Sequence, residues 1–85
     1  MKPAEERIDF ENARRVKAAV IAAIDAGDGV VDLSGVKSAD SAALSVLLAA
    51  ERRALARGLE CRIVGLPENL RTLARLYGVE PLLGL

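Results

Sequence analysis

The chain has no histidine, no tryptophan, one cysteine, one phenylalanine and one tyrosine among its 85 residues. Without histidine, no side chain has an unperturbed pKa near neutrality, which disfavours general acid–base catalysis. One cysteine and no histidine exclude both an intrachain disulfide and a Cys/His zinc site. Two aromatic residues provide few of the stacking platforms that single-stranded nucleic acids need. We therefore expect no metal, no cofactor and no nucleic-acid partner.

Charge of one sign is not in excess either, because 12 lysines and arginines balance 12 aspartates and glutamates. Such a chain has no net field to attract nucleic acid or an anionic membrane. It contains neither a Gly-x-Ser-x-Gly elbow nor a Gly-x-x-x-x-Gly-Lys phosphate loop. No apolar run approaches the roughly 20 residues of a transmembrane helix, and no signal peptide is apparent. The sequence predicts a non-enzymatic cytoplasmic protein that reaches a membrane only through a partner.

The length allows one hydrophobic core, so we expect a single domain over residues 1–85. Residues 1–6 are polar, contain Pro3, and are expected to be flexible. Apolar residues then recur at helical spacing from Phe10 to Ile24, which predicts a first helix with Asp9 as its N-cap and Gly27 as its end.

A second helix is predicted from Ser41 to Arg57, with Gly58 after it. Its apolar stripe consists of Leu44, Leu47, Leu48 and Leu55. A third helix is predicted to start near Pro67 and to end at Gly78. Its apolar side consists of Leu70, Leu73, Ala74, Leu76 and Tyr77, and Val79–Leu83 is expected to close the core.

Two short apolar segments, Val30–Leu33 and Glu60–Val64, have the composition of strands. Helices between successive strands imply parallel pairing, so the fold class is α/β. Because two strands make a poor sheet, we expect a third from Glu6–Asp9 or from a neighbouring molecule.

Two polar residues on apolar segments have alternative interpretations. Glu51 lies within the leucine stripe of the second helix, so it sits either at the edge of the core or beside an arginine. Cys61 lies in a strand, where a cysteine is usually a small buried hydrophobe rather than a redox group.

The candidate functional site is the start of the second helix, where Ser38, Asp40 and Ser41 are close in sequence. A helix N-terminus has free N–H groups and a partial positive charge, which suit capping oxygens, anions or a phosphoserine. Capping alone explains one such residue, but not three. Ser45 and Ala49 continue a strip of small side chains from Ala42 to Ala56, which either admits a partner or reflects the helix propensity of alanine.

The stretch from Val31 to Leu83 resembles the STAS domain of bacterial anti-sigma factor antagonists and sulfate transporters. The resembling pieces are Val31-Asp32-Leu33-Ser34-Gly35-Val36, Ala39-Asp40-Ser41-Ala42-Ala43-Leu44, the Arg57-Gly58 helix stop, and Leu70-Arg71-Thr72-Leu73-Ala74-Arg75-Leu76-Tyr77-Gly78-Val79. The segment Thr72–Tyr77 is also similar to the STAS subunit of Mla-type phospholipid ABC transporters. The resemblance implies a small, mostly parallel sheet with helices.

The resemblance also implies a function. Mla-type STAS subunits bind the cytoplasmic ATPase of a transporter that moves phospholipid between Gram-negative membranes and maintains outer-membrane asymmetry. In the antagonists, the phosphorylated residue lies at the position of Ala42, whereas Ser41 occupies a position that is threonine or serine in the Mla-type subunits. We therefore predict an ATPase-docking surface of Ser38, Asp40, Ser41, Ser45 and Ala49.

Two alternatives remain open. The first is a partner-switching signalling protein, similar to the anti-sigma factor antagonists, with the phosphate on Ser41 or Ser38. The second is a structural domain that assembles through its sheet. STAS domains usually begin with a strand pair, whereas only residues 1–9 precede the first predicted helix. An uncovered sheet edge would then favour a homodimer.

Overall fold

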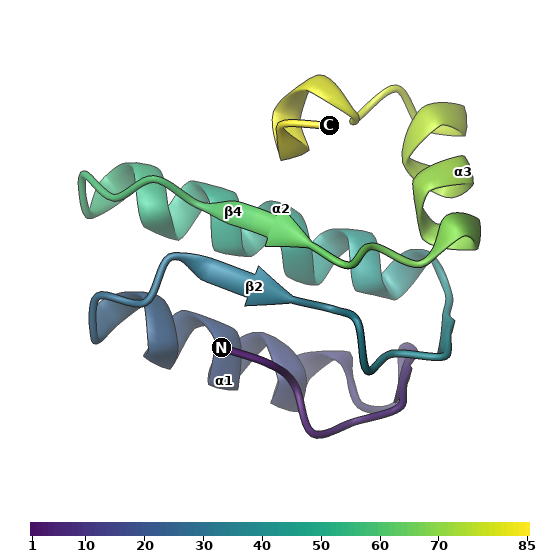
Figure 1. Ribbon diagram of the computed structural model, residues 1–85, viewed down its shortest axis with the longest axis horizontal. Coiled ribbons are helices and arrows are strands. Elements are labelled where there is room, and N and C mark those ends of the chain that lie inside the picture. The colour runs from purple at the N-terminus through teal and green to yellow at the C-terminus, as the bar shows by residue number, and fades with distance from the viewer.

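The computed structural model describes all 85 residues. The chain contains three helices, four short strands and a 3-10 turn near its end. Figure 1 shows the path of the chain from one end to the other. In chain order they are β1 (Arg7–Ile8), α1 (Ala13–Asp25), β2 (Val30–Asp32), β3 (Ser38–Ala39), α2 (Ser41–Ala56), β4 (Arg62–Val64), α3 (Glu68–Leu76) and η1 (Pro81–Leu83). The predicted α/β class is confirmed.

The strands form two parallel pairs, β1 with β3 and β2 with β4. Val31 is opposite Ile63 in one pair, and Ile8 is opposite Ala39 in the other. The predicted parallel pairing of β2 with β4 is thus confirmed. Residues 7–8 form a strand within the expected segment Glu6–Asp9, but it pairs with β3 and does not add a third strand to the β2–β4 pair. Strand β3 was not anticipated, because two residues hold too little pattern to predict a strand.

Glycine lets β2 and β4 begin close together. A Cβ atom on Gly29 would lie 2.2 Å from the carbonyl oxygen of Glu60, which precedes β4. At the other end of the pair, a Cβ atom on Gly65 would lie 2.7 Å from the backbone nitrogen of Ser34, and Gly65 has a φ of +67°. Side chains at these two positions would push the strands apart.

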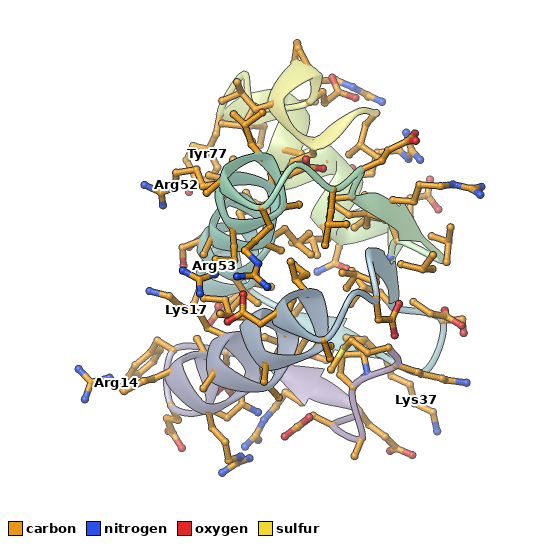
Figure 2. All side chains as sticks on the ribbon, turned by 90° about the vertical axis from the view of Figure 1, so that its left-hand side faces the viewer. Arg14, Lys17, Lys37, Arg52, Arg53 and Tyr77 are labelled. Carbon is orange, nitrogen blue, oxygen red and sulfur yellow. The ribbon has the colours of Figure 1, made fainter.

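Helices α1 and α2 form one layer, and the β2–β4 pair lies in front of α2 (Figure 1). The contact between α1 and α2 is the most extensive between any two elements. Figure 2 shows Arg53 of α2 between the two helices, where its guanidinium donates two hydrogen bonds to Asp25 of α1, at 2.7 and 2.8 Å. One apolar cluster fills the interior, so the chain has one core.

The N-terminal segment makes hydrogen bonds and ion pairs with the rest of the chain. The backbone N–H of Asp32 donates to the Met1 carbonyl at 2.9 Å, and the Met1 amino group contacts the carbonyl of Val30. Pro3 is buried, and Glu5 pairs with Arg15 at 3.4 Å. The segment therefore packs along β2 and α1.

The first helix begins later than predicted. Residues 9–12 form a turn in which the Asp9 carboxylate accepts from the N–H groups of Glu11 and Asn12, at 3.0 and 3.3 Å. Asn12 is the N-cap residue, and Phe10 lies outside the helix with 79% of its surface exposed. Asp9 satisfies N–H groups as predicted, but it does so one turn ahead of the helix.

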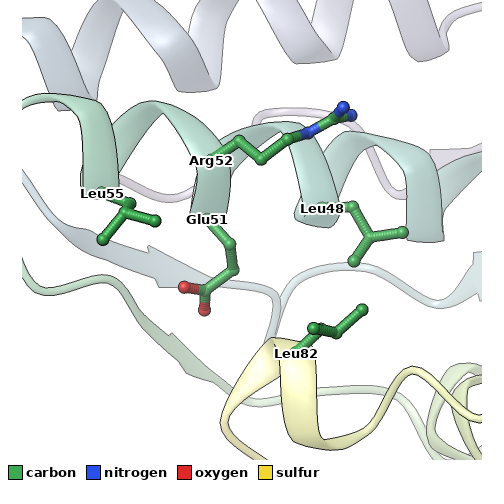
Figure 3. A pocket seen from close by; sticks show the side chains of 5 residues that line it. All are labelled: Leu48, Glu51, Arg52, Leu55 and Leu82. Carbon is green, nitrogen blue, oxygen red and sulfur yellow. The ribbon is translucent and has the colours of Figure 1, made fainter.

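Three residues predicted to face the core are exposed instead. Leu76 and Tyr77 end α3 at the surface, with Tyr77 labelled at the periphery in Figure 2. Leu55 is 81% exposed and borders a groove between α2 and η1 (Figure 3). Leu44 and Leu47 of the same stripe are buried, and Leu48 is half-buried. In the last segment Leu83 closes the core as expected, whereas Leu82 is 64% exposed.

Candidate functional site

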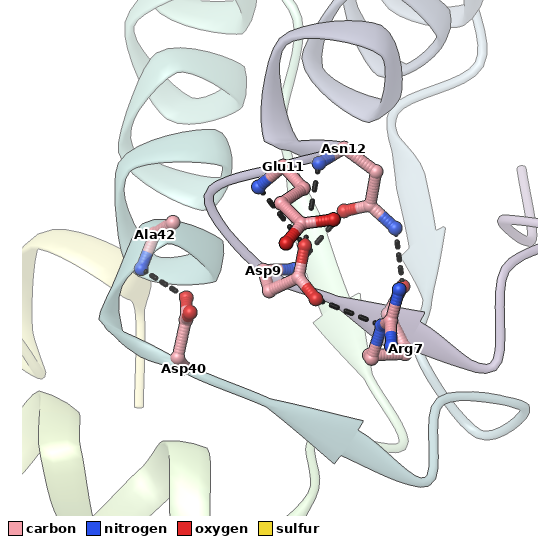
Figure 4. A network of polar contacts seen from close by, with 6 residues as sticks. All are labelled: Arg7, Asp9, Glu11, Asn12, Asp40 and Ala42. Atoms are coloured by element: carbon pink, nitrogen blue, oxygen red, sulfur yellow. Dashed lines mark hydrogen bonds and ion pairs between the residues drawn. The ribbon is translucent and has the colours of Figure 1, made fainter.

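Asp40 connects β3 to α2 and caps the helix. Its backbone is extended, with φ −108° and ψ −172°, and its N–H donates to the Ile8 carbonyl of β1 at 3.1 Å. Its Oδ1 atom accepts from the N–H of Ala42 at 2.8 Å (Figure 4). The carboxylate therefore accepts a hydrogen bond from one of the free N–H groups at the helix start. This is the capping role that the sequence indicated for such a residue.

Ser41 is the first residue of α2 and is exposed. Its hydroxyl makes no hydrogen bond within the chain, whereas the hydroxyl of Ser45, one turn later, donates to the Ala42 carbonyl at 2.7 Å. Both side chains are exposed. Ser41 thus keeps its donor and both acceptor sites for a partner, while Ser45 keeps only its acceptor sites.

Ser38 lies in β3 rather than at the helix start. Its N–H donates to the Glu6 carbonyl at 3.2 Å, and its side chain is exposed. The carbonyl of the next residue, Ala39, accepts a hydrogen bond from the Asn69 side chain of α3 at 2.8 Å. This bond ties the end of β3 to α3. The structure thus brings Asp40, Ser41 and Ser45 together at the first turn of α2 and places Ser38 just ahead of it.

Ala49 differs from the other members of the predicted docking surface because it is only 8% exposed. It lies four residues before Arg53, and such residues share a helix face. Since Arg53 bonds to Asp25 of α1, Ala49 lies at the seam between α1 and α2. Part of the strip of small side chains therefore packs against α1, and Ala49 offers little surface to a partner.

The sequence analysis missed a second polar cluster beside Asp40. The register of β1 and β3 places Asp9 next to Asp40, at the carboxyl ends of two parallel strands. Asp9 pairs with Arg7 at 2.8 Å, and the Asn12 side chain donates to the Arg7 carbonyl at 2.7 Å (Figure 4). The sequence signal for this cluster was the spacing of Asp9 and Asn12, because two polar residues three positions apart are typical of a helix start. Two helix starts consequently share one edge of the domain.

Glu51 and Cys61 form a separate contact on the other side of α2. Burial raises the pKa of the Glu51 carboxyl, and the nearby Cys61 thiol partly offsets that rise. Burial, together with the Glu51 charge, raises the pKa of Cys61 to about 11. Glu51 has no arginine partner and is half-buried, so its position at the edge of the core is confirmed. A thiol with so high a pKa is a poor nucleophile.

With the geometry described, comparison with known proteins gives the family. A family model described as "Mlab, STAS domain" matches residues 4–84. The chain belongs to the MlaB-like STAS family. No curated protein and no solved structure matches it. The match covers the N-terminal segment and β1 as well as the stretch whose resemblance was noted from the sequence.

Two further observations complete the description of this MlaB-like STAS domain. None of its helices combines the length and the apolar character needed to cross a membrane. No three acidic or cysteine side chains converge in a way that would hold a metal ion.

Proposed function

We propose that this MlaB-like STAS protein is a non-enzymatic regulatory or assembly subunit of an Mla-type phospholipid ABC transporter. It binds the transporter's cytoplasmic ATPase and so lies at the inner membrane through that partner. The observation that carries the proposal is the MlaB family match over residues 4–84. The transporter's role in outer-membrane lipid asymmetry belongs to the same proposal.

The docking surface in this proposal lies at the start of α2 and consists of the exposed Ser38, Ser41 and Ser45 and the half-buried Asp40. Asp40 is held by its cap bond to Ala42 and its backbone bond to Ile8, so the surface is rigid before the partner arrives. The unpaired hydroxyl of Ser41 then supplies a hydrogen bond to the ATPase. Leaving a buried partner group unsatisfied costs about 1–3 kcal/mol.

Replacing Ser41 with alanine tests this proposal. We expect the dissociation constant for the cognate ATPase, measured by calorimetry, to rise about 5- to 100-fold, since 1.4 kcal/mol corresponds to a factor of ten. Ser41→Thr keeps the hydroxyl and should bind nearly as the parent chain does. Thr72→Val, which removes an exposed hydroxyl from α3, is the matched control and should leave the affinity unchanged. Equal affinity of Ser41→Ala and parent would remove Ser41 from the contact.

The partner-switching alternative differs in a measurable way. A phosphate on Ser41 would meet the N-terminus of α2, which favours it, but also the adjacent Asp40 carboxylate, which repels it. The position phosphorylated in the antagonists is Ala42 here. Intact-mass measurement after incubation with the cognate kinase separates the two: a phosphorylated species that releases its partner would support switching over fixed docking.

A further inference from the structure

An apolar groove of about 520 Å³ runs between the C-terminal half of α2 and η1 (Figure 3). Leu48, Leu55 and Leu82 form its apolar lining, and Glu51 and Arg52 complete it. Leu55 is 81% exposed and Leu82 is 64% exposed. Single exposed leucines are common, but leucines from two elements that meet in one groove mark an interaction surface.

The two charges of the groove restrict what can cover it. Neither Glu51 nor Arg52 forms an ion pair within the chain. A purely apolar occupant would remove water from both charges without pairing either. An acidic occupant would be repelled by Glu51, and a basic one by Arg52. The groove needs an occupant with one charge of each sign and an apolar surface between them.

A second copy of the chain meets this requirement. In a two-fold arrangement the same patch faces itself, so each residue i that contacts j is matched by j contacting i. Glu51 of one copy then lies opposite Arg52 of the other, and this pair occurs twice. The leucines of the two grooves pack on either side of these pairs.

We propose that the groove is the contact between two copies of this chain, related by a two-fold axis that passes beside Glu51 and Arg52. The fraction of dimer rises with the concentration of the chain. Ser41 lies about 15 Å away along α2, from a rise of about 1.5 Å per residue. The dimer contact is therefore distinct from the proposed ATPase-docking surface, and neither proposal depends on the other.

Complementary charge variants test the dimer. Arg52→Glu gives each groove two acidic residues, and Glu51→Arg gives each groove two basic ones. Sedimentation should show that each variant alone dimerises at least about tenfold more weakly than the parent chain, because like charges face each other. An equimolar mixture of the two variants should recover the dimer as a heterodimer. A reductant is kept throughout, so that Cys61 cannot crosslink the copies.

Lys37→Glu is the matched charge reversal outside the groove and should dimerise as the parent does; Lys37 lies on the side of the molecule away from Arg52 (Figure 2). Circular dichroism verifies that each variant is folded. A parent chain that stays monomeric up to millimolar concentration would overturn the proposal. So would a dimer that both groove variants retain unchanged, since its contact, such as a sheet edge, would lie elsewhere.

Discussion

The two flanks of α2 differ in how completely the chain covers them. On the flank toward α1, Ala49 and Ala50 are buried, and Arg53 is bound by both carboxylate oxygens of Asp25. On the flank toward η1, Leu55 stays exposed and Glu51 has no ion-pair partner. Small side chains and a bidentate ion pair let α1 approach closely, whereas a three-residue turn is too short to cover the other flank. One flank of α2 is therefore covered within the chain, and the other is left open.

Truncating a leucine on each side of α2 should give the largest difference. Leu47 is 1% exposed and Leu55 is 81% exposed. We expect Leu47→Ala to lower the free energy of unfolding by about 2–5 kcal/mol, since it removes buried apolar surface and leaves a cavity. Leu55→Ala should change it by no more than about 0.5 kcal/mol. Urea denaturation at low micromolar concentration, where the monomer predominates, provides the measurement.

Leu55→Ala also connects this experiment with the groove. It should weaken self-association while leaving monomer stability almost unchanged. A loss of stability comparable to that of Leu47→Ala would mean that Leu55 is covered within the monomer, and the contrast between the two flanks would not hold.

The bounds of α2 were predictable from local sequence, but which of its flanks is covered was not. Asp40 and Gly58 are cap and stop signals read within a few residues, so the predicted helix from Ser41 matched α2 closely. Hydrophobic spacing shows which face of a helix is apolar, but it does not show which residues of that face a neighbouring element covers. Leu55 has the right phase for burial, yet η1 does not extend over it, whereas Ala49 is buried because α1 does reach it.

The same limit explains what was missed at the candidate site. The cap role of Asp40 follows from its place before a helix. Strand β3 and the position of Asp9 beside Asp40 depend on pairing with β1, about 30 residues earlier in the chain, which no local pattern encodes. Nor does a residue type tell whether a hydroxyl is already used: Ser45 bonds to Ala42, while Ser41 is unpaired.

The two flanks should respond to pH with opposite signs, an effect smaller than that of Leu47→Ala. The hydrogen bond from Arg53 lowers the pKa of Asp25 below its usual 3.8. Its stabilisation is thus present above about pH 4 and is lost as pH falls through the lowered pKa. Burial raises the pKa of Glu51 above its usual 4.5. The charged carboxylate therefore destabilises the fold at neutral pH, and this destabilisation is lost when Glu51 is protonated.

Asp25→Asn and Glu51→Gln separate these contributions in thermal melts from pH 3 to 8. At pH 7 we expect Asp25→Asn to lower the melting temperature and Glu51→Gln to raise it. The Glu51→Gln difference should shrink first as the pH falls, because the raised pKa of Glu51 lies above 4.5. The Asp25→Asn difference should shrink only at lower pH, because the lowered pKa of Asp25 lies below 3.8. Because Asp25 is near the surface, added salt should also weaken its contribution. Shifts of the same sign for both variants would contradict the contrast.

The effect with the least consequence for stability concerns the reactivity of the thiol beside Glu51. Only the thiolate reacts, and the pKa of Cys61 lies near 11 rather than 9.0, so the thiolate fraction at pH 8 is lower by about 100-fold. We expect Cys61 to react with a disulfide reagent about 100-fold more slowly in the folded chain than in urea. Glu51→Gln removes a negative charge next to the sulfur and should recover part of that rate, whereas Asp25→Asn on the covered flank should not. If Glu51→Gln leaves the rate unchanged, burial alone raises the pKa of the Cys61 thiol, and the charge of Glu51 has no effect on it.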